Sequence, residues 1–413
     1  MMAKRLRTLF AGALLATSLA LPAAAQDVGK GFQNFLEKDI WPAAKARGVS
    51  RAVFDAAFKG VKPNLKLPDL QLPGDTAKVE EKNRQAEFQS PSAYFDEKGL
   101  AGVAAKGRVL AKTHATVLAR IEKRTGVPAS VILAIWGRES GYGAAKIPYN
   151  AFEVLATKAY LSRRKEMFRT ELLASLDIVA DGHLTVADMR SSWAGALGQP
   201  QFMPSKFLAY AVDQDGDGRR DIWNSVPDTL ASIGNYLQQS GWAAGRGWGY
   251  EAVVPGGISC TLEGPDQGRP IADFTEAGAA RIDGRAFPAR EAKATGHLMM
   301  PAGRLGPTFI ATPNFYVIKT YNNSDLYALY IGQLADRING GGPFQGRWTR
   351  VEGMTRGDVA RLQERLVADG YDVGGADGLP GFKTRRVIGA VEKKLGLPET
   401  CWPSKGLAAK LRG

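Results

Sequence analysis

Apolar residues recur at helical spacing along most of the chain. The spacing of three and four residues is clear within 28–60 and around 101–125, recurs with interruptions between 150 and 240, and returns over 321–338. Residues at this spacing share one face of a helix, so these stretches predict amphipathic helices. Pro128, which follows a break at TGVP, is suited to the first turn of the next helix. The helix around 101–125 is expected to be amphipathic through Val109, Leu110, Val117, Leu118 and Ile121.

Three stretches depart from this pattern. The Pro-rich segment 62–95 predicts an extended arm lying on the body, and 243–310 combines Gly and Pro with short β-branched runs that predict strands and turns. The Gly-rich stretch 339–353 predicts a domain boundary. The three short helices expected after it form a module of about 60 residues, small enough to need tight packing. Its expected core is Leu362, Leu366, Val387, Val391 and Leu407.

The predicted organisation is therefore a large domain over 26–345 with a β-rich insertion at 243–310, a linker at 346–352 and a C-terminal module at 353–413. Residues 1–25 are expected to be a signal peptide, because a basic start and a short apolar run end on the A-x-A cleavage site Ala23–Ala25. A membrane span is the competing interpretation, but the run is short and lacks a stop-transfer charge cluster. With no cysteine at the cleavage point, we expect an exported protein without a membrane anchor.

Charge and cysteine content narrow the choice of partner. The formal net charge of +13 becomes +10 once the three basic residues of the leader are subtracted. Basic residues are scattered instead of forming a stripe, so export and charge together favour an acidic extracellular polymer over a nucleic acid. Cys260 and Cys401 predict a disulfide in an oxidising compartment, although two separate buried thiols are the alternative. The sequence has no Cys/His cluster that would indicate a zinc site.

The stretch WGRESGYG (136–143) places one carboxylate, Glu139, at the end of an apolar helix. Glu139 follows Ile132, Ile135 and Trp136 by seven, four and three residues, so the helix turns it towards the interior. Burial raises the pKa of a carboxyl group, as a general acid near neutral pH requires. The alternative is a last-turn glutamate that is solvated or paired with Arg138.

A second stretch, SSWAGALGQPQFMPSKF (191–207), favours the catalytic interpretation. Its glycines permit close approach of backbone to a ligand, and Ser192, Gln199 and Gln201 supply hydroxyl and amide groups suited to sugars. A helix–loop–helix connection that only needs glycines is the alternative.

Five motifs, in order, resemble the B-type lytic murein transglycosylases, which have a lysozyme-like fold. They are IWGRESGYG, AGALGQPQFMPS, DQDGDGRRDIWNSVPD, ASIGNYL followed by GW, and YNNSDLYAL, and they cover most of residues 90–340. RLQERLVADGY and DGLPGFKT resemble a three-helix peptidoglycan-binding domain. The resemblance implies a mainly α (α+β) fold, a periplasmic location and peptidoglycan glycan strands as the partner.

The resemblance also implies a reaction, namely cleavage of the MurNAc–GlcNAc β-1,4 bond with formation of 1,6-anhydro-MurNAc. Glu139 matches the single glutamate that protonates the glycosidic oxygen and then acts as base on the C6 hydroxyl. A standard glycosidase needs a second carboxylate as nucleophile or base, but the substrate's own N-acetyl oxygen can replace that nucleophile, so no partner acid is required. No catalytic cofactor is expected. A hydrolytic muramidase and a non-catalytic peptidoglycan-binding or scaffold protein remain alternatives.

Other residues carry over from the family less directly. Ser192 and Gln201 match residues that contact the N-acetyl group and hold the acid, while the remaining matches line the sugar cleft. These are Tyr236, Tyr321, Asn322 and Tyr327, with Tyr94 as a looser match. Each tyrosine could instead be core packing.

The motif DQDGDGRRDIWNSVPD (213–228) predicts a cation site. Asp213, Asp215, Asp217 and Gly218 occupy positions 1, 3, 5 and 6 of an EF-hand-like loop, in which carboxylates converge on a hard cation. Position 12 is Asn224 instead of glutamate, and the family resemblance implies Asp228 as the final ligand and the Arg219 carbonyl as another. Structural Ca²⁺, or Na⁺, is expected; a solvated Asp-Gly turn is the alternative.

Overall fold

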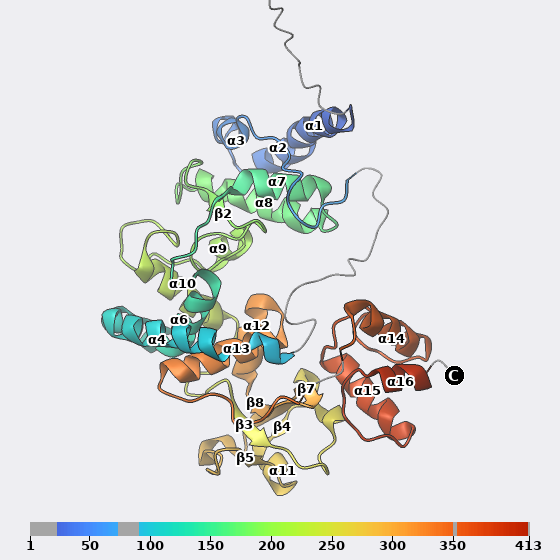
Figure 1. The fold of residues 1–413 in the computed structure, drawn as a ribbon. Coiled ribbons are helices and arrows are strands. Elements are labelled where there is room, and N and C mark those ends of the chain that lie inside the picture. The colour runs from blue at the N-terminus through green and yellow to red at the C-terminus, as the bar shows by residue number, and fades with distance from the viewer. Residues whose placement is uncertain (1–22, 73–90, 350–352, 412–413) are drawn as a thin grey trace, which may run out of the picture.

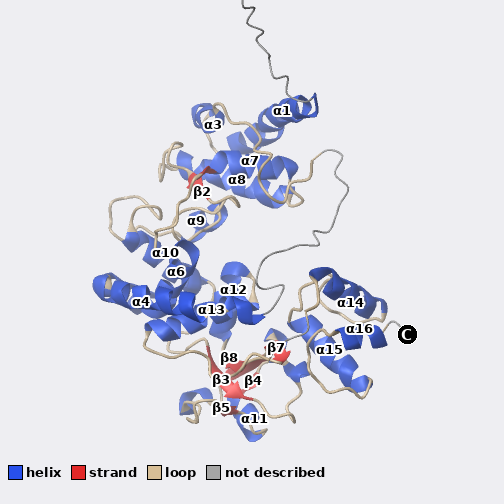
Figure 2. Cartoon of the chain, in the orientation of Figure 1, coloured by secondary structure: helices blue, strands red, loops and turns tan. Residues whose placement is uncertain are grey.

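The computed structural model describes residues 23–72, 91–349 and 353–411, and within them the fold is mainly helical with two small sheets (Figures 1 and 2). The predicted fold class is thus confirmed. The predicted signal peptide lies almost wholly outside the described residues. No helix among the described residues has the length and apolar character needed to cross a membrane.

The N-terminal helices pack on one end of the body. The elements are α1 (Ala23–Phe35), a π-helical turn (Leu36–Ile40), α2 (Trp41–Ala46) and α3 (Arg51–Phe58), which lie against α7 (Ala151–Leu161) and α8 (Lys165–Ala180). Edge-to-face contact between Phe58 and Phe152 seals this junction. The helical spacing predicted for 28–60 is confirmed.

The described part of the predicted arm does lie on the body. Lys158 of α7 donates a hydrogen bond to the Pro68 carbonyl, and the backbone N–H of Asn64 donates to the Thr157 hydroxyl. Residues 73–90 lie outside the described residues. The arm ends in a short 3-10 helix, Pro91–Tyr94.

The prediction of a single helix around 101–125 is wrong, because the segment forms two helices that meet at His114. They are α4 (Glu97–Thr113) and α5 (Ala115–Thr125). α4 buries small residues, Ala104 and Gly107, while Val109 is 63% exposed. The bend allows α4 and α5 to turn different faces to the core, which one straight helix could not do. The prediction that Val109 faces the core is therefore wrong, whereas Leu118 and Ile121 are buried and Leu110 and Val117 are partly buried against the core.

Two helices from distant parts of the sequence form the centre of the body. α6 (Ala129–Ser140) begins directly after Pro128 and packs against α13 (Asp325–Ile338), as Figure 1 shows. The helix predicted over 321–338 is interrupted at Asn323, whose positive φ of 50° ends α12 (Pro313–Asn322). α10 (Val226–Gln239) packs against α6, and α9 (Pro204–Tyr210) packs against α8 and α10. The short strands β1 (Tyr149–Asn150) and β2 (Arg190–Ser191) pair with each other beside α7.

The predicted β-rich insertion is confirmed as a five-stranded antiparallel sheet in the order β4-β6-β8-β3-β5. The strands are β3 (Gly249–Val253), β4 (Arg269–Pro270), β5 (Ala280–Arg281), β6 (Thr295–Met299) and β8 (Thr308–Ala311), with α11 (Ile271–Glu276) and β7 (Pro301–Arg304) between them. Leu298 and Ile310 pair across neighbouring strands and form a second core with Phe274.

Three helices follow the Gly-rich junction: α14 (Arg356–Ala368), α15 (Phe382–Lys394) and α16 (Lys405–Lys410). Their core contains the five predicted residues, with Val387 partly buried. The module lies beside the sheet (Figure 1), and Cys260 of the insertion is disulfide-bonded to Cys401. The domain boundaries themselves stay a prediction.

Candidate functional site

Glu139 lies in the last turn of α6 and faces α13. The Tyr327 hydroxyl of α13 donates a hydrogen bond of 2.6 Å to Glu139 Oε1. Tyr327 is 1% exposed, so this contact is made within the protein, while Glu139 keeps part of its surface exposed. A carboxyl that is both partly accessible and held by a buried donor is suited to proton transfer.

The glycines of WGRESGYG permit the close packing around this carboxyl. Gly141 and Gly143 have φ values of 59° and 77°, which end α6 and fold the chain back. A Cβ on Gly137 would lie 2.6 Å from the Tyr142 ring, and one on Gly143 would lie 2.4 Å from Gln199 Oε1. Larger residues at these positions would therefore displace the walls of the site.

Gln199 ties this helix end to the glycine-rich loop. Its Oε1 accepts a 2.8 Å hydrogen bond from Trp136 Nε1, and its Nε2 donates to the Trp223 carbonyl at 2.8 Å. Gly198 has a φ of 60°, and a Cβ there would approach the Ile222 carbonyl to 2.7 Å. Gln199 is thus a structural bridge that fixes the loop.

A tyrosine cluster extends from the carboxyl. Tyr321 and Tyr327 stack with ring centroids 6.2 Å apart, and Tyr236 meets Tyr321 edge-on at 4.9 Å. The Tyr321 hydroxyl donates to the Pro200 carbonyl at 2.7 Å, and the Tyr236 hydroxyl donates to the Thr320 carbonyl at 2.8 Å. Three of the predicted cleft tyrosines therefore lie together beside Glu139.

Burial and neighbouring charges act on Glu139 in opposite directions. Burial raises the pKa of Glu139 above its usual value, and this outweighs the lowering by the Tyr327 hydrogen bond and by the cations Arg138 and Lys206. Burial also raises the pKa of Tyr327 and of Tyr321 well above the usual value, with the Glu139 charge adding to the effect. The tyrosines therefore stay protonated as donors, and the carboxyl is biased towards holding its proton.

Two cations near the site were not among the predicted residues. Lys206 Nζ lies 3.0 Å from the Tyr236 hydroxyl, and the Arg138 guanidinium donates to the Tyr94 hydroxyl at 2.8 Å. Lys206 is the last residue but one of the quoted loop motif and lies within α9, and its place in the sequence did not indicate which way its side chain points. Arg138 was considered only as a partner for Glu139.

The other predicted sugar-contacting residues lie less directly at the carboxyl. Tyr94 is linked to it through Arg138, while Asn322 is exposed at the end of α12. Ser192 Oγ accepts from the Ala196 N–H at 3.2 Å, and Gln201 Nε2 donates to the Gly198 carbonyl at 2.8 Å. Gln201 also has a positive φ of 54°, so its backbone shapes the loop. Their roles towards a ligand stay predictions.

The aspartate loop gathers three of its predicted ligands. Asp213, Asp215 and Asp217 each offer a carboxylate oxygen within 4.8 Å of the others, an all-oxygen set that suits a hard cation. Asp217 is also paired with the Arg219 guanidinium at 3.0 Å. Asp228 is fully buried, and its carboxylate accepts from the backbone of 214, 215 and 221 at 2.7–3.3 Å. Asp228 therefore holds the backbone of the loop in place. Its role as a ligand stays a prediction.

Comparison with known proteins agrees with this geometry. Residues 31–336 match the family model described as transglycosylase SLT domain. The chain is 31% identical over 214 residues to membrane-bound lytic murein transglycosylase B of Escherichia coli (strain K12), a match that covers 52% of this chain. It spans only 57% of that relative's length.

Solved structures extend the likeness over more of the chain. Pseudomonas aeruginosa SltB3 in complex with NAG-NAM-pentapeptide matches with a TM-score of 0.82 and 37% identity, over 92% of this chain and 99% of that one. Escherichia coli Slt35 in complex with calcium matches in fold, with a TM-score of 0.59 and 24% identity over 75% of this chain and 93% of that one. The family model covers well over half of the sequence, and the motif resemblance is confirmed: the chain belongs to the family of transglycosylase SLT domains and resembles its B-type lytic transglycosylases.

Proposed function

We propose that this protein is a lytic transglycosylase that cleaves the MurNAc–GlcNAc β-1,4 bond of peptidoglycan and leaves a 1,6-anhydro-MurNAc end. The observation that carries the proposal is the position of Glu139, a carboxyl with a raised pKa that accepts a hydrogen bond from a buried tyrosine at the end of α6. The SltB3 complex with a NAG-NAM-pentapeptide supports the substrate class.

In the proposed reaction, Glu139 first gives its proton to the glycosidic oxygen. The N-acetyl oxygen of MurNAc attacks C1 as the bond breaks, which replaces the nucleophilic carboxylate of other glycosidases. Glu139 is then ionised, and it takes the proton of the C6 hydroxyl while that oxygen closes on C1 and the bond between C1 and the N-acetyl oxygen breaks. Tyr327 assists both steps of the reaction, because its hydrogen bond stabilises the Glu139 carboxylate without preventing its protonation.

The charged groups around Glu139 support a mechanism with one acid. The charged side chains that shift its pKa are the cations Arg138 and Lys206, and no second carboxylate is among them in the described residues. We propose that Lys206 stabilises negative charge that develops at this site. A hydrolytic muramidase, which activates water with a second carboxylate, is less well supported.

Other parts of the chain support action in the bacterial cell envelope. We propose that the signal-like N-terminus directs the protein to the periplasm, that α14–α16 bind the wall, and that the aspartate loop holds structural Ca²⁺ or Na⁺. The calcium complex of Slt35 is consistent with this last proposal. Ser192, Gln201, Asn322 and Tyr94 are proposed to complete the glycan-binding cleft.

The test is Glu139→Gln in the full chain, with purified sacculi as substrate. This variant keeps the shape of the side chain and removes the proton, so we expect lysis to fall by at least about 100-fold. Sedimentation with sacculi is expected to persist, since the module that binds the wall is unchanged. Mass spectrometry of the wild-type products is expected to find 1,6-anhydro ends.

Glu166→Gln is the matched control, because Glu166 is exposed in the first turn of α8 and receives the same change. Unchanged lysis by Glu139→Gln would refute the catalytic assignment and leave a binding or scaffold protein. Products one water heavier, with reducing ends, would identify a hydrolytic muramidase instead.

A further inference from the structure

A buried arginine of the C-terminal module contacts the helix that carries Tyr327. Arg385 of α15 is 4% exposed at its side chain, and its Nε and Nη2 donate to the two carboxylate oxygens of Glu263 at 2.9 and 2.6 Å. Nη2 also lies 3.1 Å from Asp325 Oδ2, and Nη1 donates to the Pro380 carbonyl at 2.8 Å. All three guanidinium nitrogens are thus engaged, which a lysine could not reproduce.

Asp325 is the first residue of α13, two positions before Tyr327. It is held between Arg385 and Lys319, whose Nζ lies 2.8 Å from Oδ1. Burial acts to raise the pKa of Asp325, but the two cations outweigh it and hold this pKa below its usual value. Asp325 is therefore a carboxylate anchored at the N-terminus of α13, where negative charge is also favoured by the helix dipole.

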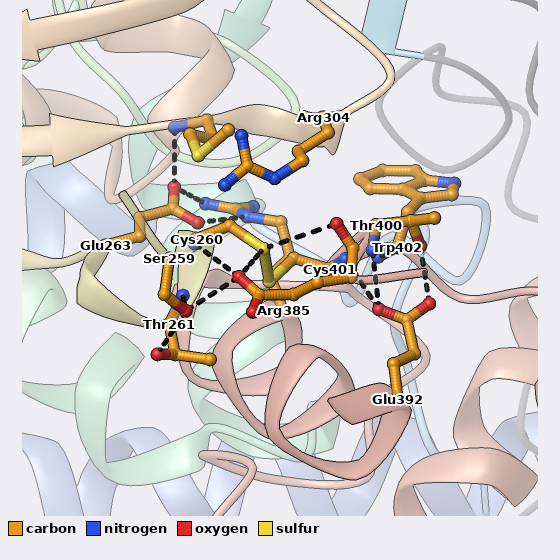
Figure 3. Close-up of a disulfide and its surroundings, with 12 residues drawn as sticks. Ser259, Cys260, Thr261, Glu263, Arg304, Arg385, Glu392, Thr400, Cys401 and Trp402 are labelled. Carbon is orange, nitrogen blue, oxygen red and sulfur yellow. Dashed lines mark hydrogen bonds and ion pairs between the residues drawn. A yellow bond between two sulfur atoms is a disulfide. The ribbon is translucent and has the colours of Figure 1, made fainter. Parts of the chain in front are cut away.

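α15 is itself fixed against the insertion. Figure 3 shows Arg385 and the Cys260–Cys401 disulfide side by side, with Glu392 of α15 bonded to the backbone of Thr400 and Cys401. A Cβ on Gly389 would lie 2.2 Å from Cys401 Sγ, so α15 rests directly on the disulfide. Arg385 thus extends from a firmly seated helix to the start of α13.

We propose that Arg385 is a positioning residue for the catalytic site, which sets the first turn of α13, and thereby Tyr327 against Glu139, from the C-terminal module. The module is then part of the catalytic assembly as well as a wall-binding unit. This inference rests on the function proposed above for Glu139. Because Tyr327 donates to Glu139, a displaced first turn weakens a contact that both halves of the reaction use.

The test compares Arg385→Gln with Arg386→Gln in the full chain. Arg386 is the next residue of α15 and also pairs across this interface, with Asp266 at 2.7 Å, but that pair does not involve α13. Arg385→Gln is expected to lower kcat about tenfold, as a small misplacement of a reacting group does, with KM nearly unchanged. In the pH profile of kcat/KM, the alkaline limb of Arg385→Gln is expected to move to higher pH. The Tyr327 hydrogen bond lowers the pKa of Glu139, so a weaker bond lets this pKa rise. Arg386→Gln is expected to leave kcat and the alkaline limb of kcat/KM unchanged.

A double-variant cycle with Tyr327→Phe separates positioning from general loosening. If Arg385 acts through Tyr327, adding Arg385→Gln to Tyr327→Phe changes the pH profile no further. Additive effects, or equal behaviour of the Arg385 and Arg386 variants, would overturn the inference even where Glu139→Gln is inactive. Unchanged lysis by Glu139→Gln would instead overturn the function on which it rests.

Two further variants decide the matter if Arg385→Gln does not fold. Arg385→Lys keeps the charge without the three-way contact, and Asp325→Asn keeps the Arg385–Glu263 pair while weakening the contact to α13. Both are expected to shift the alkaline limb in the same direction as Tyr327→Phe. Wild-type profiles for both would contradict the proposal.

Discussion

The carboxyl proposed as catalytic is defined by a balance at one side chain. Burial favours the protonated form of Glu139, while Tyr327 and the two nearby cations favour the ionised form. A group that acts first as acid and then as base needs both forms to be accessible. Tyr327 adjusts this balance without charge, because its own raised pKa keeps the phenol protonated.

Removing this donor should therefore have a defined pH signature. In Tyr327→Phe the carboxylate loses a stabilising hydrogen bond, so the pKa of Glu139 rises further and the protonated acid persists to higher pH. We expect the alkaline limb of kcat/KM to shift upwards and kcat to fall roughly tenfold, the effect of about 1.4 kcal/mol. The measurement is a pH–rate profile on soluble glycan strands.

Tyr250→Phe provides the control, since Tyr250 is a tyrosine of β3 that packs on Phe287, away from the tyrosine cluster. Its profile is expected to match the wild type. A downward shift of the alkaline limb in Tyr327→Phe would contradict the role given to this hydrogen bond.

At the scale of elements, the sequence predicted helices well and their breaks poorly. The spacing of Ile132, Ile135 and Trp136 correctly predicted that Glu139 lies on the inner face of α6. The prediction succeeded because all these residues belong to one uninterrupted helix. The breaks at His114 and Asn323 depend on how neighbouring helices pack, which local spacing does not encode. For the same reason the direction of Lys206 was not predictable, since it faces residues more than 100 positions away at Thr320.

In the aspartate loop, the sequence spacing correctly predicted that three carboxylates gather, but it did not predict how the Asp228 side chain is oriented. The odd spacing of Asp213, Asp215 and Asp217 brought three carboxylates together. The Asp228 side chain is instead turned to the loop backbone, and burial raises its pKa even though the backbone N–H groups at 214, 221 and 215 act to lower it. Three exposed acids so close repel one another unless a cation is bound.

Calcium should accordingly stabilise the protein through this loop. At a concentration about a hundredfold above Kd, we expect Tm to rise by about 5 °C relative to a chelator-treated sample. Asp213→Asn should abolish this difference, whereas Asp273→Asn, the same change at an exposed site on α11, should keep it. A calcium effect that persists in Asp213→Asn would place the ion elsewhere, and equal effects of calcium and sodium that both persist in this variant would argue for charge screening alone.

At the scale of the whole molecule, three distant segments meet at one interface. The insertion supplies Cys260 and Glu263, the start of α13 supplies Asp325, and the C-terminal module supplies Cys401 and Arg385. The sequence left the pairing of the two cysteines open, because neither lies in a spacing motif. A link across 141 residues depends on tertiary structure, which the local pattern does not contain.

The disulfide should therefore hold the module to the body after the chain is cut between them. A site-specific protease sequence inserted after the exposed Arg347 gives two fragments on cleavage. On a denaturing gel, we expect the two fragments to migrate as one band without reductant and as two bands with it. The Cys260→Ser/Cys401→Ser variant is expected to give two bands in both conditions. In the uncut protein, the double serine variant should lose about 2–4 kcal/mol of unfolding free energy, because the unfolded chain is no longer cross-linked. Two bands from the wild type without reductant would show that the thiols are unpaired, and the module would then be held by its ion pairs and packing alone.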